Sequence, residues 1–341
     1  MKLLIVGSNS VHVSSFIASI ENDTKELLLL AEESCSFVDS NREFVLSFRS
    51  LNPFFLIFNL IRLKRLIRIL KPDLIHVHQV NRLAFFVSLV AVRLKLPFIV
   101  TAWGSDVLTI PKKNRLYFEM VRYVLKEAVF VTADSSEMIK TMRGISPDSN
   151  KYKLLQYGID IVPQSDKEQL IFSNRLHKSL YQIDKIIDHF AEFVKYYSTW
   201  RLVIAGHGSE TNHLKQLVTD YGIEDKVSFV GWLNKEANYD FYSRAEIYIT
   251  IPKSDGMSVS VLEAMSAGCI PIVADLAVSK EWINNGVNGV ICSSTSNPFF
   301  DAVKLSQPDV AVINLKLVNK KATRKASNAL FFELYSKCIK L

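Results

Sequence analysis

Cysteine is scarce in this chain, and its positions form no metal-binding pattern. The 341 residues contain four, at Cys35, Cys269, Cys292 and Cys338. They include no CxxC pair and no cluster with histidine, which argues against a zinc site and favours free thiols in a reducing compartment. We therefore expect a cytoplasmic protein with no metal centre.

Long hydrophobic runs are also lacking, although 49% of the residues are hydrophobic. The N-terminus, MKLLIVGSNS, has a run of four apolar residues between Lys2 and Gly7, whereas the apolar core of a secretory signal has roughly 7–15. The run at 84–92, AFFVSLVAV, ends at Arg93 and is shorter than the roughly 18 apolar residues of a transmembrane helix. These features predict neither export nor a membrane-spanning helix.

Acidic residues are few in one part of the chain. The net charge is +7, and residues 62–126 contain 13 Lys and Arg but only three acids. A basic surface of this kind favours contact with a polyanion or an anionic membrane. Nucleic acid is the less favoured partner, because in the basic segment 52–73 no aromatic side chains for base stacking alternate with the basic ones. We therefore predict peripheral contact with the inner face of a membrane through residues 62–126.

Short apolar segments alternate with helical patterns along the whole chain. The expected strands occupy 2–7, 73–78, 97–103, 128–135, 169–175, 200–208, 226–232, 246–252 and 269–275. Strands that alternate with helices predict parallel sheets covered on both faces, and the length suits two such α/β domains. The polar, turn-rich segment 156–169 is the expected linker. We predict domains at 1–160 and 161–320 and a C-terminal helix at 321–341, whose return to the first domain stays open.

The stretch SDGMSVSVLEAMSAGCIPIVAD (254–275) contains the strongest candidate site. Asp255 and Gly256 follow an expected strand, and a helix is expected to begin near Ser258. Ligands of open parallel sheets bind beyond the carboxyl ends of the strands, and the N–H groups at a helix N-terminus bind anions. Glu263, more than a turn into the helix, would accept hydrogen bonds from sugar hydroxyls. The alternative, in which Asp255 caps the helix and Glu263 is a surface acid, stays open.

This stretch resembles the acid-x7-Glu signature of the retaining glycosyltransferases of family four, which move a sugar from a nucleotide donor to an acceptor hydroxyl. The similarity extends to IAGHGSETNHLKQLV (204–218), VTADSSEMIK (131–140) and LQYGID (155–160). It implies the GT-B fold, in which two doubly wound Rossmann-like domains face a central cleft. The family usually has Glu where this chain has Asp255, and a second Gly where it has Ser258.

The resemblance also assigns roles at the donor site. In that family the second acid holds the ribose, the loop backbone meets the diphosphate and the first acid contacts the donor sugar. The donor-binding residues that it implies here are Gly206, Gly256, Met257, Ser258 and Glu263. Asp255 is expected to contact the donor sugar.

The segment SNRLHKSLYQIDKII (173–187) resembles the part of the family that supplies cations to the diphosphate. Arg175 stands in the family's arginine position, and a planar guanidinium makes two charge-assisted bonds to phosphate. Tyr181 occupies the position of the usual lysine, for which Lys178 is the candidate substitute. The expected catalytic residues are therefore Asp255, Arg175 and Lys178. For both cations, a surface ion pair is the alternative.

Other motifs supply candidates for the acceptor side, namely Gly7, Ser8, His78, Trp103 and Asp106. VTAWGSDVL (100–108) resembles the family's loop that faces donor sugar and acceptor, with Trp103 in place of its histidine. For Asp106 we favour helix capping over a contact with the acceptor, and for His78 a purely structural role is an equal alternative. HVHQVN (76–81) offers two histidines and no third ligand, so it does not predict a metal site.

The segment NPFFLIFNLIRLKRLIRILKPD (52–73) has the pattern of a basic amphipathic helix. Leu60, Leu63, Ile67 and Leu70 share one face, and Lys64, Arg65, Arg68 and Lys71 lie roughly opposite. We expect the apolar face to pack on the sheet and the basic face to help the protein dock on anionic lipid.

Together these observations predict a retaining glycosyltransferase that transfers a hexosyl or N-acetylhexosaminyl group. The donor would be UDP- or GDP-linked and the acceptor a glycan or a lipid-linked glycan, as in polysaccharide, capsule, lipopolysaccharide or glycolipid synthesis. The resemblance implies that neither a metal nor another cofactor is required. Three alternatives stay open: a nucleotide-sugar epimerase, a phosphorylase of the same architecture that uses pyridoxal phosphate, and a non-catalytic relative at the membrane.

Overall fold

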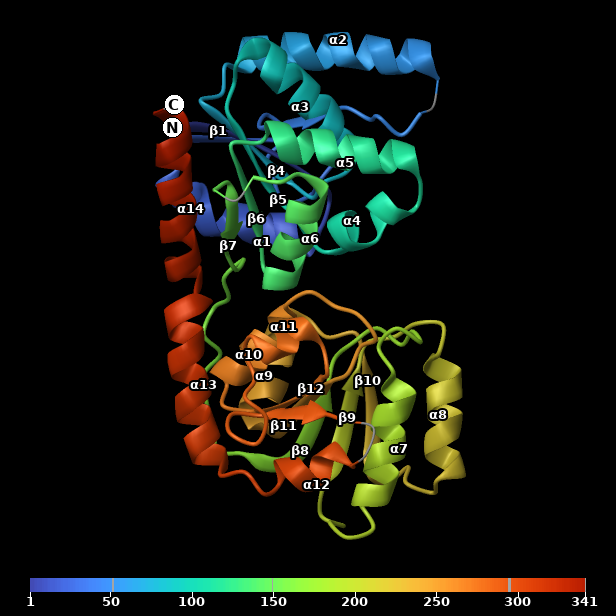
Figure 1. Cartoon of the computed structure of the whole chain (residues 1–341). Coiled ribbons are helices and arrows are strands. Elements are labelled where there is room, and N and C mark those ends of the chain that lie inside the picture. The colour runs from blue at the N-terminus through green and yellow to red at the C-terminus, as the bar shows by residue number, and fades with distance from the viewer. Residues whose placement is uncertain (51, 149, 294–295, 341) are drawn as a thin grey trace. The chain divides into compact units, whose positions relative to one another are not determined.

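The computed structural model describes residues 1–50, 52–148, 150–293 and 296–340. In it the chain forms two compact units, Met1–Tyr157 with Ser327–Leu341, and Gly158–Ala326 (Figure 1). Each unit is a twisted parallel sheet with helices on both faces, which confirms the predicted fold class of two doubly wound Rossmann-like domains.

The sheet of unit 1 has seven strands within the described residues, in the order β3-β2-β1-β4-β5-β6-β7, and all of its pairings are parallel. They are β1 (Lys2–Gly7), β2 (Glu26–Ala31), β3 (Glu43–Val45), β4 (Leu74–His78), β5 (Phe98–Thr101), β6 (Phe130–Ala133) and β7 (Tyr152–Leu154). The order reverses between β1 and β4, so the loops after these two strands diverge and leave space at the carboxyl edge.

Two groups of helices cover the two faces of this sheet (Figure 1). They are α1 (Val11–Ile20), α2 (Pro53–Leu70), α3 (Arg82–Leu94), α4 (Ser105–Leu108), α5 (Arg115–Glu127), α6 (Ser136–Ile145) and α14 (Arg324–Ile339), with 3₁₀ turns at Glu21–Asp23 and Ile110–Lys112. Alternate residues of β1 point to opposite faces, as a strand requires. Leu4 and Val6 pack with α2, α3, α5 and α6, whereas Leu3 and Ile5 pack with α1 and α14.

Helix α14 belongs to unit 1, although the chain reaches it from unit 2. Its Phe331 and Tyr335 are buried with Phe16 of α1, and the Tyr335 hydroxyl lies 2.7 Å from Nδ1 of His76. The sequence predicts a helix at 321–341, and in the structure α14 starts at Arg324, three residues after the end of α13 (Gln307–Lys321). Residue 341 lies outside the described residues.

The sheet of unit 2 has six described strands in the order β10-β9-β8-β11-β12-β13. They are β8 (Glu168–Ser173), β9 (Arg201–Ala205), β10 (Val227–Gly231), β11 (Ala245–Thr250), β12 (Ile270–Ala274) and β13 (Val290–Cys292). The helices are α7 (Ile183–Phe193), α8 (Thr211–Asp220), α9 (Lys235–Arg244), α10 (Val259–Ser266), α11 (Ala277–Lys280), α12 (Pro298–Ala302) and α13 (Gln307–Lys321). Here the strand order reverses between β8 and β11.

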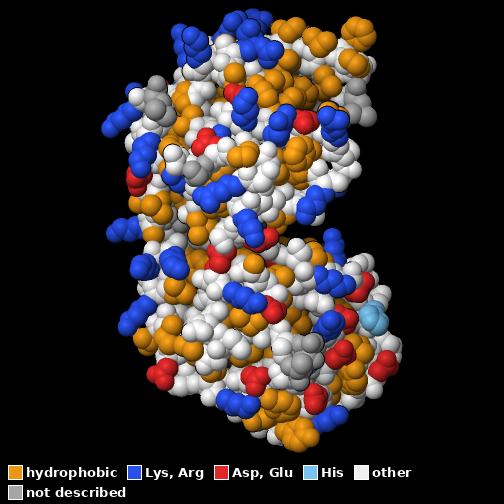
Figure 2. All heavy atoms as spheres, in the orientation of Figure 1, with side chains coloured by type: hydrophobic (Ala, Val, Ile, Leu, Met, Phe, Trp, Pro, Cys, Tyr) orange, Lys and Arg blue, Asp and Glu red, His pale blue; other side chains and the backbone are white. Residues whose placement is uncertain are grey.

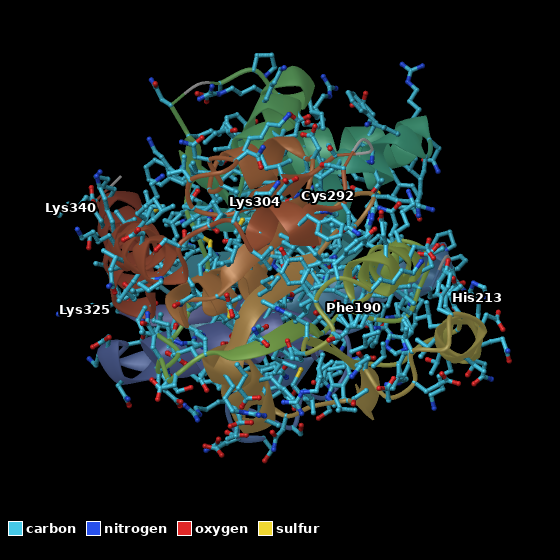
Figure 3. All side chains as sticks on the ribbon, turned by 90° about the horizontal axis from the view of Figure 1, so that it is seen from below. Phe190, His213, Cys292, Lys304, Lys325 and Lys340 are labelled. Carbon is cyan, nitrogen blue, oxygen red and sulfur yellow. The ribbon has the colours of Figure 1, made fainter. Side chains whose placement is uncertain are left out.

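The helices of unit 2 bury apolar faces at helical spacing against the two sides of this sheet. Phe190 of α7 is fully buried with Ile204 and Ile249, whereas His213 of α8 lies at the outer surface (Figure 3). On the other side, Leu262 and Met265 of α10 pack with the strands and with α9. This packing fixes the N-terminus of α10 at the carboxyl edge of β11.

In the part of the chain that the structure describes, none of the helices combines the length and the apolar character that crossing a bilayer requires.

Candidate functional site

The loops after β8 and β11 meet at the point where the strand order of unit 2 reverses. The two strands pair in parallel, so their carboxyl ends lie next to each other. Arg175 follows β8, and its guanidinium bonds to Asp255 and Ser258 of the loop after β11, at Nη2–Oδ2 2.5 Å and Nη1–Oγ 2.7 Å. Arg175, one of the candidate cations, is thus brought together with the candidate acid and the first residue of the candidate anion site.

The Arg175 side chain is held in a largely buried position, with 14% of its surface exposed. Its guanidinium carbon lies 4.5 Å from the centre of the Tyr181 ring, which is a cation–π contact. Tyr181 replaces the lysine expected from the family pattern, and its ring supports the arginine instead of adding a second charge. Lys178 is exposed in the same loop.

The N-terminus of α10 is arranged to meet an anion. Ser258 is its N-cap residue, and its hydroxyl accepts from Arg175 instead of bonding back to the helix. The first N–H groups of α10 therefore have no side-chain cap and carry the positive end of the helix dipole. Gly256 and the buried Met257 precede this turn and line a pocket with Asp255 and Ser258.

Two glycines after β9 allow the neighbouring loop to approach Arg175. Gly206 has φ +99°, and a Cβ there would lie 2.6 Å from the backbone oxygen of Arg175. At Gly208 a Cβ would lie 2.4 Å from the backbone oxygen of His177. Both distances are shorter than real Cβ contacts, so a side chain at either position would push the two loops apart.

Glu263 lies on α10, more than a turn beyond Ser258, against tyrosines of α9. Burial, together with the charge of this carboxyl group, raises the pKa values of the Tyr239 and Tyr242 hydroxyls. Burial raises the pKa of Glu263 to about 7, and the charges of Lys235 and Arg324 only partly offset this effect. A pKa shift of this size is typical of carboxyl groups in functional sites. The expected alternative of a solvated surface acid does not describe Glu263.

The candidates in unit 1 form a separate group at the carboxyl edge of its sheet. His78 is buried, its Nδ1 lies 2.8 Å from the hydroxyl of Tyr157, and burial lowers its pKa to about 3. Nε1 of Trp103 donates to the same hydroxyl at 2.5 Å. The indole N–H expected to face a sugar is thus bonded within unit 1. Ser8 lies in the loop after β1 and is partly exposed.

Asp106 and Gly7 have structural explanations. Asp106 is fully buried, and its carboxylate accepts from the backbone N–H groups of Val80 and Trp103 at 2.8 and 3.0 Å. It lies in the first turn of α4, whose N-cap residue is Gly104, so Asp106 is not itself the N-cap residue of that helix. At Gly7 a Cβ would lie 2.8 Å from Val13 Cγ2, so close packing of α1 on the sheet accounts for this glycine.

Sequence reasoning missed the aromatic partners of the site. Tyr239 and Tyr242 are spaced three residues apart on α9, which places them on one helix face. That spacing was visible in the sequence, but the contact with Glu263 depends on how α9 and α10 pack.

The histidines of HVHQVN have a structural role. The ring nitrogens of His76 are hydrogen-bonded with Tyr335 and Thr101. No group of three metal-ligating side chains occurs among residues 1–50, 52–148, 150–293 and 296–340.

Comparison with known families gives two matches that together cover most of the chain. The family described as "Glycosyl transferases group 1" matches residues 160–300, and "Glycosyl transferase 4-like" matches residues 2–135. A GDP-mannose:cellobiosyl-diphosphopolyprenol alpha-mannosyltransferase of Xanthomonas oryzae pv. oryzae is 25% identical over 138 residues, which are 40% of this chain and 35% of that protein. The chain thus matches about a third of that relative's length.

Solved structures match over nearly the full length, at low sequence identity. Alr3699/HepE of Anabaena in complex with UDP has a TM-score of 0.81 at 14% identity, covering 99% of this chain and 100% of that one. The lipopolysaccharide outer core galactosyltransferase WaaB has a TM-score of 0.73 at 15% identity, covering 98% and 99%. These likenesses confirm the GT-B fold.

Proposed function

The chain belongs to the glycosyl transferases of group 1, and from this premise we propose that it moves a sugar from a nucleotide-sugar donor to an acceptor hydroxyl. The observation that supports this most is the Arg175 guanidinium, which bridges Asp255 and Ser258 at the N-terminus of α10. A cation and the N–H groups of a helix N-terminus meet there, and a leaving diphosphate requires both kinds of group.

The diphosphate would bind between Arg175 and the start of α10. A guanidinium has five N–H donors, and the two bonds to Asp255 and Ser258 leave three for phosphate oxygens. Lys178 would approach from the exposed part of the same loop. These side chains and the helix dipole would supply the positive charge at the leaving group, so that no metal ion would be required.

The ribose and the donor sugar would be held by the two acids of the 254–275 stretch. Glu263, supported by Tyr239 and Tyr242, would accept hydrogen bonds from the ribose hydroxyls. Asp255 would contact the sugar beside the diphosphate, with Gly206, Gly256 and Met257 shaping the loops around it. These residues are the same donor contacts that the family resemblance implies.

The reaction that we propose retains the configuration of the donor sugar. The bond between the anomeric carbon and the diphosphate oxygen breaks, and the electron pair leaves with the diphosphate. The acceptor hydroxyl forms the new bond on the same face, and its proton passes to the leaving phosphate oxygen. Positioning and stabilisation of the leaving group would supply most of the rate enhancement.

The proposed acceptor is a glycan or a lipid-linked glycan at the inner face of a membrane, and the donor sugar is a hexose or an N-acetylhexosamine. Support comes from relatives, one named for a diphosphopolyprenol acceptor and another for the lipopolysaccharide outer core. The excess of basic residues in 62–126 is also consistent with an anionic surface. For unit 1, His78 and Trp103 are proposed to lie near the acceptor.

The first experiment is thermal unfolding with UDP, GDP, ADP, CMP and their sugars. Ligand at about 100 times its dissociation constant adds about 2.7 kcal/mol of stability. We expect one nucleotide to stabilise the wild type, and Glu263→Ala to abolish the effect. Glu224→Ala, which removes an exposed acid of unit 2, is the matched control. If no nucleotide stabilises the wild type, the non-catalytic alternative replaces this proposal, and donor turnover without an acceptor would instead indicate an epimerase.

A further inference from the structure

Helix α2 buries only part of its apolar surface. Leu63 and Ile67 are fully buried on the sheet, and Leu56, Leu60, Leu66 and Leu70 pack partly against it. This is the inward face that the sequence predicts. A second set of large apolar side chains lies in solvent: Phe54, Phe55, Ile57, Phe58, Ile61 and Ile69. A helix that exposes six such residues needs an explanation beyond the packing of unit 1.

The exposed apolar residues are concentrated in the first half of the helix. Phe54, Phe58 and Ile61 are 84%, 57% and 63% exposed and follow the i, i+4, i+7 spacing of one helix face. The basic residues follow in the second half, where Arg62, Arg65, Arg68 and Lys71 are exposed. Figure 2 shows this division along α2, with hydrophobic side chains over one end and Lys and Arg over the other.

No acid interrupts this surface on the helix itself. Residues 53–71 contain five Lys and Arg and no Asp or Glu, and the Arg62 guanidinium lies 5.7 Å from the centre of the Phe58 ring. The surface continues into a groove beside β3 that Val45 and Ile69 line. Glu43 also lines that groove, but its carboxylate accepts from Ser34 and Cys35 at 2.9 and 2.5 Å.

We propose that the first half of α2 inserts into the interface of an anionic bilayer, with Phe54, Phe58 and Ile61 below the headgroups and the following basic residues on lipid phosphates. Amphipathic helices at membranes combine these two contacts, an apolar face in the acyl boundary and cations at the headgroups. The predicted contact through residues 62–126 was electrostatic only. The structure adds an apolar anchor N-terminal to it.

The charge of α2 favours a lipid surface over a second copy of this chain as the partner that covers its exposed face. Two copies paired through α2 about a two-fold axis would each bring five cations to the contact with no acid of the same helix to face them. An anionic bilayer supplies the opposite charge and an apolar interior together. The inference rests on the peripheral membrane contact of the proposed function, but vesicle binding needs neither donor nor acceptor, so its failure and the failure of glycosyl transfer are distinguishable.

The test is sedimentation of the full chain with vesicles of phosphatidylcholine alone or mixed with phosphatidylglycerol, at low and high salt. We expect binding to the anionic vesicles, with a part that persists at high salt because apolar insertion is not screened. The triple variant Phe54→Ser, Phe58→Ser, Ile61→Ser should lose the salt-resistant part, at least about tenfold in affinity. The triple variant Arg62→Gln, Arg65→Gln, Arg68→Gln should lose the preference for anionic lipid.

A matched control removes exposed apolar side chains elsewhere, through Tyr196→Ser and Val312→Ser in unit 2. This variant should bind vesicles like the wild type. A second readout is quenching of Phe58→Trp fluorescence by brominated lipid, compared with Tyr196→Trp, and we expect quenching only at position 58. The inference is overturned if the wild type ignores vesicles or if the apolar triple variant binds as tightly. A wild-type dimer that this triple variant converts to a monomer, with vesicle binding unchanged, would overturn it too.

Discussion

At the scale of single residues, the carboxyl group of Glu263 is the part of the site whose pKa lies close to neutral pH. Burial raises the pKa of this carboxyl to about 7, and the side chain of Tyr242 only partly offsets this effect. An ionised carboxylate is the stronger acceptor for ribose hydroxyls. We expect the affinity for the nucleotide sugar to rise between about pH 6 and about pH 8 in the wild type and to stay flat in Glu263→Gln. Calorimetric titration with the intact nucleotide sugar measures this, since its diphosphate diester does not titrate there.

The same raised pKa predicts a stability change with a definite sign. The folded state binds the proton more tightly than the unfolded state, so the stabilisation is present at acid pH and is lost as pH rises from about 4.5 through about 7. Relative to Glu263→Gln, the wild type should therefore lose stability over this window. Urea unfolding at the two ends of the window checks it. An equal pH dependence in both proteins would contradict the assignment.

The substitution Arg175→Lys tests whether the planar geometry of the guanidinium matters, in addition to its charge, at the proposed diphosphate site. Arg175→Lys keeps the positive charge but loses the fork that reaches Asp255 and Ser258 together. A hydrogen bond to a charged group contributes about 1.5–3 kcal/mol, so kcat/KM should fall at least about tenfold. Arg201→Lys, at an exposed pair with Glu168, is the control and should change little. Wild-type kinetics in Arg175→Lys would remove Arg175 from the site.

At the scale of elements, the loops after β8 and β9 depend on glycine. Gly208→Ala would place a Cβ 2.4 Å from the oxygen of His177, and overpacking of this kind destabilises by about 1–3 kcal/mol. Gly144→Ala is the contrasting variant, because its Cβ would meet nothing within 4 Å inside α6. We expect that change to stabilise by about 0.5–1 kcal/mol. Denaturant unfolding measures both, and the idea of close loop packing fails if the two variants behave alike.

Elements with a clear period or a long apolar run were predictable from the sequence. The segments at 2–7, 73–78 and 246–252 became β1, β4 and β11 within one or two residues. The strand β2, with the run ELLLLA, was missed, because a short apolar run does not distinguish a buried strand from a helix. The three-residue strands β3, β7 and β13 are too short to show a period.

One part of the candidate site could also be predicted from the sequence, whereas another part could not. The bridge from Arg175 to Asp255 follows from two loops at adjacent strand ends, which the alternation of strands and helices already places together. The surroundings of Glu263 do not follow, because they depend on the packing of α9 on α10. The surroundings of Asp106 do not follow either: helix capping is predicted from neighbours in sequence, whereas one of its two partners, Val80, lies in a different loop.

At the scale of the whole molecule, α14 completes the core of unit 1. Tyr335→Phe would remove the hydroxyl that lies 2.7 Å from the buried His76 ring and would leave that nitrogen unpaired. A buried polar atom without a partner costs about 1–3 kcal/mol. We expect faster hydrogen exchange in β1 and β4, with the strands of unit 2 unchanged. Tyr196→Phe, at a residue that is 75% exposed, should alter neither unit.

The placement of α14 also sets an order on biosynthesis. A ribosome makes residues 1–157 first, yet the side chains that close their core, Phe331 and Tyr335, emerge only after the whole of 158–326. Unit 2 is continuous in sequence and can fold as it emerges, whereas unit 1 must wait with the apolar surface around Phe16 uncovered. The half of the protein that is translated first is therefore the half that is finished last, and it is the one that would depend on chaperones during synthesis.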